Sequence, residues 1–167
     1  MRRLALIAVL VGAPACRVSL EKDYEAPPDT ANVLSVSCQA AKDELHPTAA
    51  FLETTVFKVG CTSMSCHDSD QPEDDQDLTA GHAWMSTVNF VSQEQVDPQY
   101  LVVVPGQPKK SYLMMRIHQI KGADMDPPLP DPAPSDEDDF YMPQRASDLC
   151  VEKREAIQRW IEDGAPM

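Results

Sequence analysis

The sequence predicts a small, mostly α-helical domain with long loops that are rich in proline and acidic residues. Apolar residues recur at helical spacing in three segments, at 47–60, 108–121 and 147–163. The chain contains 15 prolines but only six glycines, a balance typical of short elements joined by stiff, extended loops. Its 167 residues are enough for one domain with its own core.

The charge of the chain excludes one class of partner. Asp and Glu total 27 against 14 Lys and Arg, which gives a net charge of −13. Such a chain repels a phosphate backbone, so we expect no nucleic-acid partner. The sequence also lacks a nucleophile–base arrangement and a glycine-rich phosphate loop, so we do not expect an enzyme.

The N-terminus has the pattern of an export signal. Two arginines after Met1 precede the apolar run from Leu4 to Gly12, which predicts a signal peptide over residues 1–15. That run is too short to span a bilayer. Export would place the cysteines in an oxidising compartment.

The residues after the apolar run resemble a bacterial lipobox, in which a cysteine becomes the lipidated first residue. Here Ala13-Pro14-Ala15 precedes Cys16, so we expect a lipid anchor at Cys16; ordinary cleavage after Ala15 is the alternative. Residues 16–37 predict a flexible tether, and residues 38–167 the folded domain. We expect the protein in the cell envelope, at the outer membrane or in the periplasm.

Each helical segment has its own start and stop signals. The first begins near Pro47 and ends at Gly60, and the second begins at Pro108 and is closed by Gly122. The third is capped by Ser147 and stopped by Gly164. Their apolar faces comprise Phe51, Leu52, Val56 and Val59; Leu113, Met114, Ile117 and Ile120; and Leu149, Ala156, Ile157, Trp160 and Ile161.

The intervening segments are shorter or irregular. Residues 79–88 predict a short helix with Thr79 as its N-cap, and residues 102–104 predict an extended piece that leads into a turn at Pro105-Gly106. Residues 68–77 and 123–139 are strongly acidic, and we expect both to be loops without a core face.

One short stretch carries most of the chemical character of the chain. Cys61 and Cys66 are separated by four residues, and His67 follows directly. A Cys-x-x-Cys-His run attaches c-type haem through two thioether bonds, and its His ligates the iron. The spacing here is longer than that pattern, but two thiols and an adjacent His can still meet one porphyrin edge.

With this motif the chain resembles the single-domain, cytochrome c-like envelope lipoproteins of some bacteria, including myxobacteria, in which a Cys-x4-Cys-His variant occurs. The resemblance runs from about Val56 to Pro166. It includes Asp77-Leu78-Thr79, Val104-Pro105-Gly106-Gln107-Pro108, Ser111-Tyr112-Leu113, Met142-Pro143, and the Ile157-x-x-Trp160-Ile161-x-x-Gly164-Ala165 segment. It implies a cytochrome c-like fold and a methionine before the final helix as the second axial ligand.

Two methionines are candidates for that ligand. A thioether is a soft ligand that suits haem iron. Met142 is followed by Pro143 and lies just before the last helix, in a stiff loop, so we favour it. Met125 lies in the acidic insert and is the alternative; without haem, either side chain would simply fill a gap under a loop.

The count of five cysteines leaves two for a disulfide. With Cys16 lipidated and Cys61 and Cys66 bound to haem, Cys38 and Cys150 remain, and an oxidising compartment favours joining them. The rival interpretation makes Cys61–Cys66 a second disulfide in a domain without haem.

Other metal-binding interpretations are weaker. Cys61, Cys66 and His67 with His82 could bind zinc, but no second Cys-x-x-Cys pair supports this. The acidic runs lack the spacing of a calcium loop. His46, His82 and His118 are each explained as surface or half-buried structural residues.

The sequence therefore predicts a lipid-anchored envelope protein that transfers single electrons through a covalently bound haem c. Its partner would be a redox protein with a basic docking patch, and their encounter should weaken with salt. The alternative is a haem-free, disulfide-stapled envelope module that binds a protein or glycan.

Overall fold

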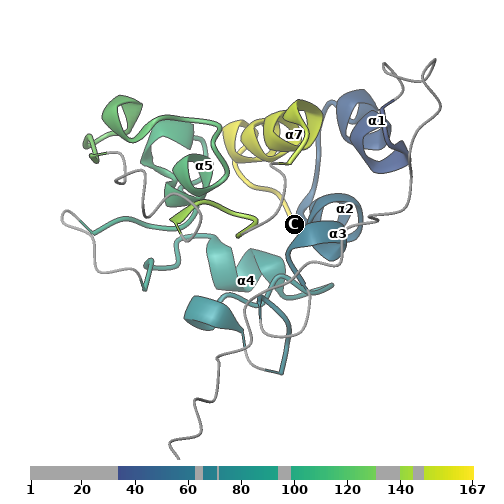
Figure 1. The fold of residues 1–167 in the computed structure, drawn as a ribbon, viewed down its shortest axis with the longest axis horizontal. Coiled ribbons are helices and arrows are strands. Elements are labelled where there is room, and N and C mark those ends of the chain that lie inside the picture. Colours follow the sequence, from purple (N-terminus) through teal and green to yellow (C-terminus); the bar gives the residue numbers. More distant parts are fainter. Residues whose placement is uncertain (1–33, 63–65, 71, 94–98, 131–139, 145–148) are drawn as a thin grey trace, which may run out of the picture.

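A computed structural model of the protein describes residues 34–62, 66–70, 72–93, 99–130, 140–144 and 149–167. The described chain is mostly helical (Figure 1). Its elements are α1 (Val36–Asp43), α2 (Ala49–Leu52), the π-helical turn η1 (Glu53–Phe57), α3 (Lys58–Gly60), α4 (Ala83–Thr87), α5 (Tyr112–Arg116), α7 (Val151–Glu162), and the 3-10 turns η2 (Glu73–Asp75), η3 (Pro108–Lys110) and η4 (Gly122–Asp124).

Extended backbone contributes single bridges rather than strands in the part of the chain that is described. Val103 pairs with Val88, and Leu101 pairs with both Val91 and Ser111. Residues 101–103 are therefore extended, as the run of β-branched side chains predicts. No described helix is long and apolar enough to cross a membrane.

The segment from α2 to α3 is one helical rod, with the bounds that the sequence predicts. Thr48 caps it, because its side chain accepts a hydrogen bond from the Phe51 N–H at 3.2 Å. The rod includes the π-helical turn η1, in which Glu53 is buried. The Glu53 carboxylate accepts hydrogen bonds from the N–H groups of Gly81 (2.7 Å) and Ala83 (3.1 Å), so it attaches the start of α4 to the rod.

Helix α7 packs most extensively against α1, a helix that the sequence analysis did not predict (Figure 1). The Arg159 guanidinium donates to the carbonyl groups of Ala41 (2.6 Å) and Glu44 (3.0 Å), at the end of α1. A cation there stabilises the unpaired carbonyls of the helix terminus. The pair α1–α7 thus joins the first and the last helix of the described chain.

The principal core lies between these helices. Phe57 of the rod and Trp160 of α7 belong to the same buried cluster. The whole predicted face of α7 is buried, namely Ala156, Ile157, Trp160 and Ile161. Gly164 follows with a φ of 90°, the left-handed conformation that ends a helix.

Three expectations about the elements are wrong. The predicted helix over 108–121 is shorter, because η3 and α5 are separated at Ser111 and the backbone of His118 has a φ of 58°; such a residue ends an α-helix. α4 begins at Ala83 with His82 as its N-cap, not at Thr79. α7 begins at Val151 with Cys150 as its N-cap, and the proposed cap Ser147 lies outside the described residues.

The acidic insert was also expected to lack a core face, and this is wrong. Met125 and Leu129 are 3% and 4% exposed. They form a second apolar cluster with Tyr100, Tyr112 and Met115. Residues 131–139 of the insert lie outside the described residues.

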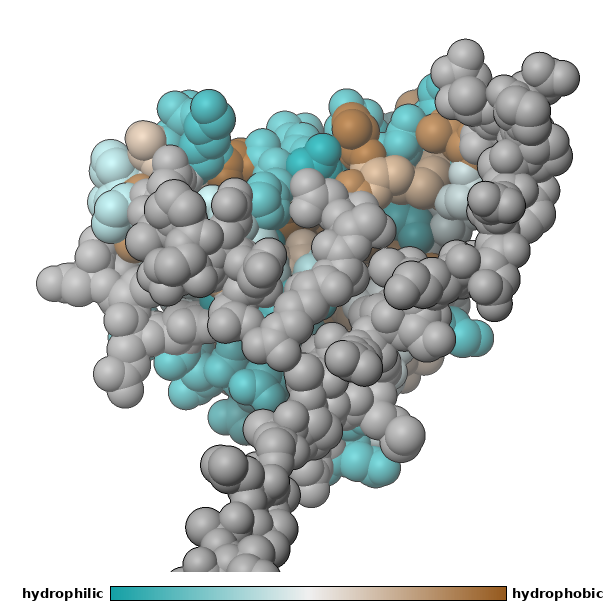
Figure 2. All heavy atoms as spheres, viewed as in Figure 1, coloured by the Kyte–Doolittle hydropathy of each residue, from teal (hydrophilic) through white to brown (hydrophobic). Residues whose placement is uncertain are grey.

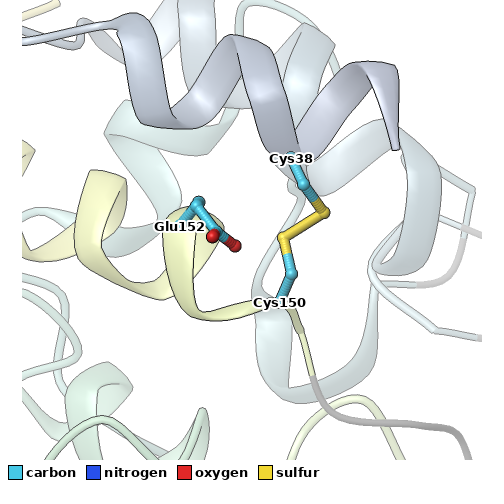
Figure 3. Close-up of side chains that lie close together, drawn as sticks. All are labelled: Cys38, Cys150 and Glu152. Atoms are coloured by element: carbon cyan, nitrogen blue, oxygen red, sulfur yellow. A yellow bond between two sulfur atoms is a disulfide. The ribbon is translucent and has the colours of Figure 1, made fainter. Parts of the chain in front are cut away.

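A disulfide joins Cys38 of α1 to Cys150 at the start of α7 (Figure 3). The two residues are 112 positions apart, and they are the pair left over in the cysteine count. A crosslink that closes so long a loop restricts the unfolded chain strongly.

We predict that the double variant Cys38→Ser/Cys150→Ser is less stable by about 3–5 kcal/mol, the range expected for a loop of this length. Urea unfolding of the variant and of the wild-type protein would measure the loss. The wild-type protein with this disulfide reduced should match the variant. Equal midpoints for the oxidised wild type and the variant would contradict the prediction.

Candidate functional site

The candidate site begins where α3 ends. Cys61 directly follows Gly60, and its N–H donates to the Phe57 carbonyl at 2.8 Å, which continues the helical hydrogen bonding. The His67 N–H donates to the Cys61 carbonyl at 3.1 Å. Although residues 63–65 are not described, this bond fixes the backbone of His67 beside that of Cys61. The two ends of the motif therefore lie together.

The ring of His67 is held in one orientation by main-chain carbonyls. Its Nδ1 lies 3.2 Å from the carbonyl oxygen of Glu73 and 3.1 Å from that of Gln76. A carbonyl oxygen only accepts hydrogen bonds, so Nδ1 must carry the proton and donate it. In the neutral ring, the lone pair is then on Nε2.

Burial keeps that ring neutral. His67 is 8% exposed, and burial lowers its pKa; the two carbonyl contacts and the charge of Asp74 oppose this, while the charge of Arg116 adds to it. Among the described residues, Nε2 has no hydrogen-bond partner. A neutral imidazole with Nδ1–H bound to a carbonyl is the arrangement in which histidine ligates a metal through Nε2.

The loop that supplies these carbonyls was missed as a functional element. The sequence identifies residues 68–77 only as a solvated acidic loop, whereas its backbone wraps around the motif. The Glu73 N–H donates to the Cys66 carbonyl at 2.7 Å, and the Leu78 N–H donates to the His67 carbonyl at 2.9 Å. Main-chain groups carry no signature in the sequence, so no pattern of side chains could have identified them.

Cys61 is a free thiol in a partly buried position. Burial raises its pKa to about 12, and the nearby positive charge of Lys153 in α7 opposes this. Lys153 is 6% exposed, and burial lowers its pKa. The rival Cys61–Cys66 disulfide is therefore not formed in this structure.

Cys66 is 7% exposed and takes part in a disulfide. Neither Cys61 nor the Cys38–Cys150 pair supplies its partner. Attachment of a haem to Cys66 would require its reduced form. Cys16, the proposed lipidation site, lies outside the described residues.

The two methionine candidates have different surroundings. Met125 fills the second apolar cluster against Tyr100 and Met115, so it already has a structural role. Met142 is partly buried, and its N–H donates to the Arg116 carbonyl at 2.6 Å, which fixes its backbone against α5. Met142 is therefore the candidate whose side chain is not committed to a core cluster.

The segment of Met142 also lies next to the motif. A Cβ atom placed on Gly60 would be 4.0 Å from the Cγ of Pro143 and 4.0 Å from a side-chain carbon of Leu149. Gly60 precedes Cys61, and Pro143 follows Met142. The fold thus brings the two predicted ligand segments, which are distant in the sequence, into neighbouring positions.

The remaining histidines are engaged elsewhere. His46 is paired with Asp163 at 2.9 Å, and His82 with Asp77 at 3.1 Å, through side chains that are 83% and 55% exposed for the histidines. The ring of His118 lies 3.5 Å from that of Tyr141, centroid to centroid. These contacts agree with the expectation of surface or half-buried structural histidines.

One group of potential metal ligands lies away from the motif. The sulfur atoms of Cys38 and Cys150 and a carboxylate oxygen of Glu152 are within 4.8 Å of one another (Figure 3). Because the two sulfurs are bonded to each other, they are not thiolates and do not offer the ligands that a metal needs. We assign this group a structural role only.

In comparisons with known proteins, no family model, no curated protein and no solved structure matches the chain. The site must therefore be interpreted from its own geometry.

We predict that the Cys61 thiol of the haem-free protein is strongly protected from alkylation. A rise in pKa from 9.0 to about 12 lowers the thiolate fraction at pH 8 by roughly 1000-fold, and the thiolate is the reactive form. Iodoacetamide labelling at pH 8, in buffer and in urea without reductant, followed by peptide mass spectrometry, would measure the ratio. Similar rates in the two conditions would show that Cys61 is not desolvated.

Proposed function

We propose that this chain is a cytochrome c-like electron-transfer domain that binds a haem covalently through Cys61 and Cys66, with His67 and Met142 as axial ligands of the iron. The observation that carries the proposal is the state of His67. A neutral ring with Nδ1–H held by two carbonyls and a free lone pair on Nε2 is suited to binding iron.

The position of the two cysteines supports the same assignment. Cys61 ends the rod formed by α2, η1 and α3, and the His67 N–H is bonded to its carbonyl. The motif therefore starts from a rigid element, and rigid support is what a ligand of fixed geometry requires. Cys61 is a free thiol, and Cys66, once reduced, would offer the second thiol that thioether attachment needs.

The distal ligand is supported by packing. Pro143 lies near Gly60, and Met142 is attached to α5 by a main-chain hydrogen bond. Haem would supply the one-electron chemistry, and a thioether ligand raises its potential relative to a second histidine. An iron ligand that stays bound in both oxidation states keeps the reorganisation energy of electron transfer small.

The proposed setting is the cell envelope, with a lipid on Cys16 as the membrane anchor. The net charge of −13 favours a redox partner with a basic docking patch, and salt should weaken their association. The proposal includes no catalytic step on a substrate.

The first test is the presence of haem. We expect the protein, exported in a host with cytochrome-maturation machinery, to retain haem on a denaturing gel and to give a c-type pyridine haemochrome spectrum. The double variant Cys61→Ser/Cys66→Ser should lose the haem stain, whereas Cys38→Ser/Cys150→Ser, which removes a disulfide outside the motif, should keep it. A colourless wild type from a host that matures Cys-x4-Cys-His proteins would favour the haem-free, disulfide-stapled binding module instead.

The second test separates the two methionines. Met142→Ala should lower the reduction potential and change the visible spectrum, because the iron loses its thioether ligand. Met125→Ala is the matched control: it removes a buried side chain and should cost about 2–5 kcal/mol of stability without altering the potential. Redox titration and urea unfolding of both variants would check this. A changed potential in Met125→Ala alone would assign the ligand to Met125.

A further inference from the structure

The acidic loop that holds His67 ends at Asp77. This residue stands between two others that bind His67. The carbonyl oxygen of Gln76 lies 3.1 Å from Nδ1 of the ring, and the Leu78 N–H donates to the His67 carbonyl at 2.9 Å. The position of the Asp77 backbone therefore determines where both groups lie. The surroundings of His67 thus depend on a residue outside the Cys-x4-Cys-His motif.

Asp77 is itself held by the residues that lead into α4. Its Oδ1 accepts hydrogen bonds from the N–H (2.9 Å) and the hydroxyl group (2.5 Å) of Thr79. Its Oδ2 lies 3.1 Å from Nδ1 of His82, the N-cap of α4. The hydroxyl of Ser86, within α4, donates to the Asp77 carbonyl at 2.6 Å. Since the Asp77 side chain is only 15% exposed, water replaces these bonds poorly.

The start of α4 is attached in turn to the rod that ends beside Cys61. The buried Glu53 carboxylate accepts hydrogen bonds from the N–H groups of Gly81 and Ala83, and the Cys61 carbonyl accepts one from the His67 N–H. The rod, the start of α4, the end of the acidic loop and the motif are therefore connected in a closed series of hydrogen bonds. Asp77 is the residue through which the loop joins this series.

We propose that Asp77 is a positioning residue for the iron ligand His67: its carboxylate anchors the acidic loop to α4, so that the Gln76 carbonyl accepts the Nδ1–H proton. This inference rests on the proposed function, and it assigns a role to one particular carboxylate of the acidic loop. Asp77 acts only through the backbone on either side of it. The Glu73 carbonyl, four residues before Asp77, remains the second acceptor of that proton.

The sign of the effect follows from the chemistry of imidazole. A carbonyl that accepts the Nδ1–H proton makes Nε2 a stronger electron donor. A stronger donor stabilises the more positive, oxidised iron, so it lowers the reduction potential. Loss of the Gln76 carbonyl from Nδ1 should therefore raise the potential. In the haem-free chain, the same loss weakens the preference for the Nδ1–H tautomer, so the neutral ring should also populate the Nε2–H form.

The experiment combines redox titration of the haem-loaded protein with ¹⁵N NMR of the His67 ring in the haem-free chain. In Asp77→Ala we expect the reduction equilibrium to shift toward the reduced form by about tenfold, the low end of the effects of losing a partner of a metal-bound histidine. This shift corresponds to about 59 mV for a one-electron couple. The ring nitrogens of His67 should report a mixture of tautomers in place of the Nδ1–H form.

Two further variants separate positioning from general stability. Asp77→Asn keeps an oxygen that accepts the hydrogen bonds from Thr79, so it should keep the wild-type potential and tautomer. Asp163→Ala is the matched control, because Asp163 forms an Asp–His pair with His46 at 2.9 Å, outside the acidic loop. It should leave both measured quantities unchanged.

A wild-type potential and tautomer in Asp77→Ala would overturn this inference and leave the proposed function intact. So would a shift of equal size in Asp163→Ala. If Asp77→Ala does not fold, the double variant Thr79→Val/Ser86→Ala removes the two hydroxyl groups that hold Asp77, and unchanged values in that variant would overturn the inference as well. A wild-type protein without haem, from the competent host, would overturn the proposed function, whereas the His67 tautomer in the haem-free chain would still decide the role of Asp77.

Discussion

The structure of the motif depends on how His67 is held by the backbone. Its Nδ1–H is bound by carbonyls of Glu73 and Gln76, and its own N–H and carbonyl are bound by Cys61 and Leu78. A histidine with these contacts cannot rotate its ring without losing hydrogen bonds in a buried setting, where each loss is costly. The acidic loop is therefore part of the site through its main chain, while its carboxylates contribute to the negative charge of the domain.

The rest of the fold holds that loop and the motif in fixed positions relative to each other. The helical rod that ends at Gly60 is attached to α4 by the Glu53 carboxylate, and α4 follows the loop that holds His67. On the other side, α7 is attached to α1 by a disulfide and by Arg159. In Figure 2, apolar and hydrophilic residues alternate on the described surface near α1 and α7. The loop and the motif thus lie between two firmly attached helical parts.

The acidic and basic side chains of the domain differ in where they lie. Most carboxylates are on the surface, where water and salt screen them, whereas Arg116 and Lys153 are buried beside the motif.

The sequence by itself determined the helical character, the bounds of the rod, the buried face of α7 and the pairing of Cys38 with Cys150, because these follow from apolar periodicity, capping residues and the cysteine count. Tertiary structure decided the rest. Helix α1 was not predicted, and it is stabilised by its packing on α7 and by Arg159. Met125 lies in an acidic segment, and it is buried only by the second cluster. The tautomer of His67 likewise depends on two carbonyls that come from a folded loop, and backbone groups are the same in every sequence.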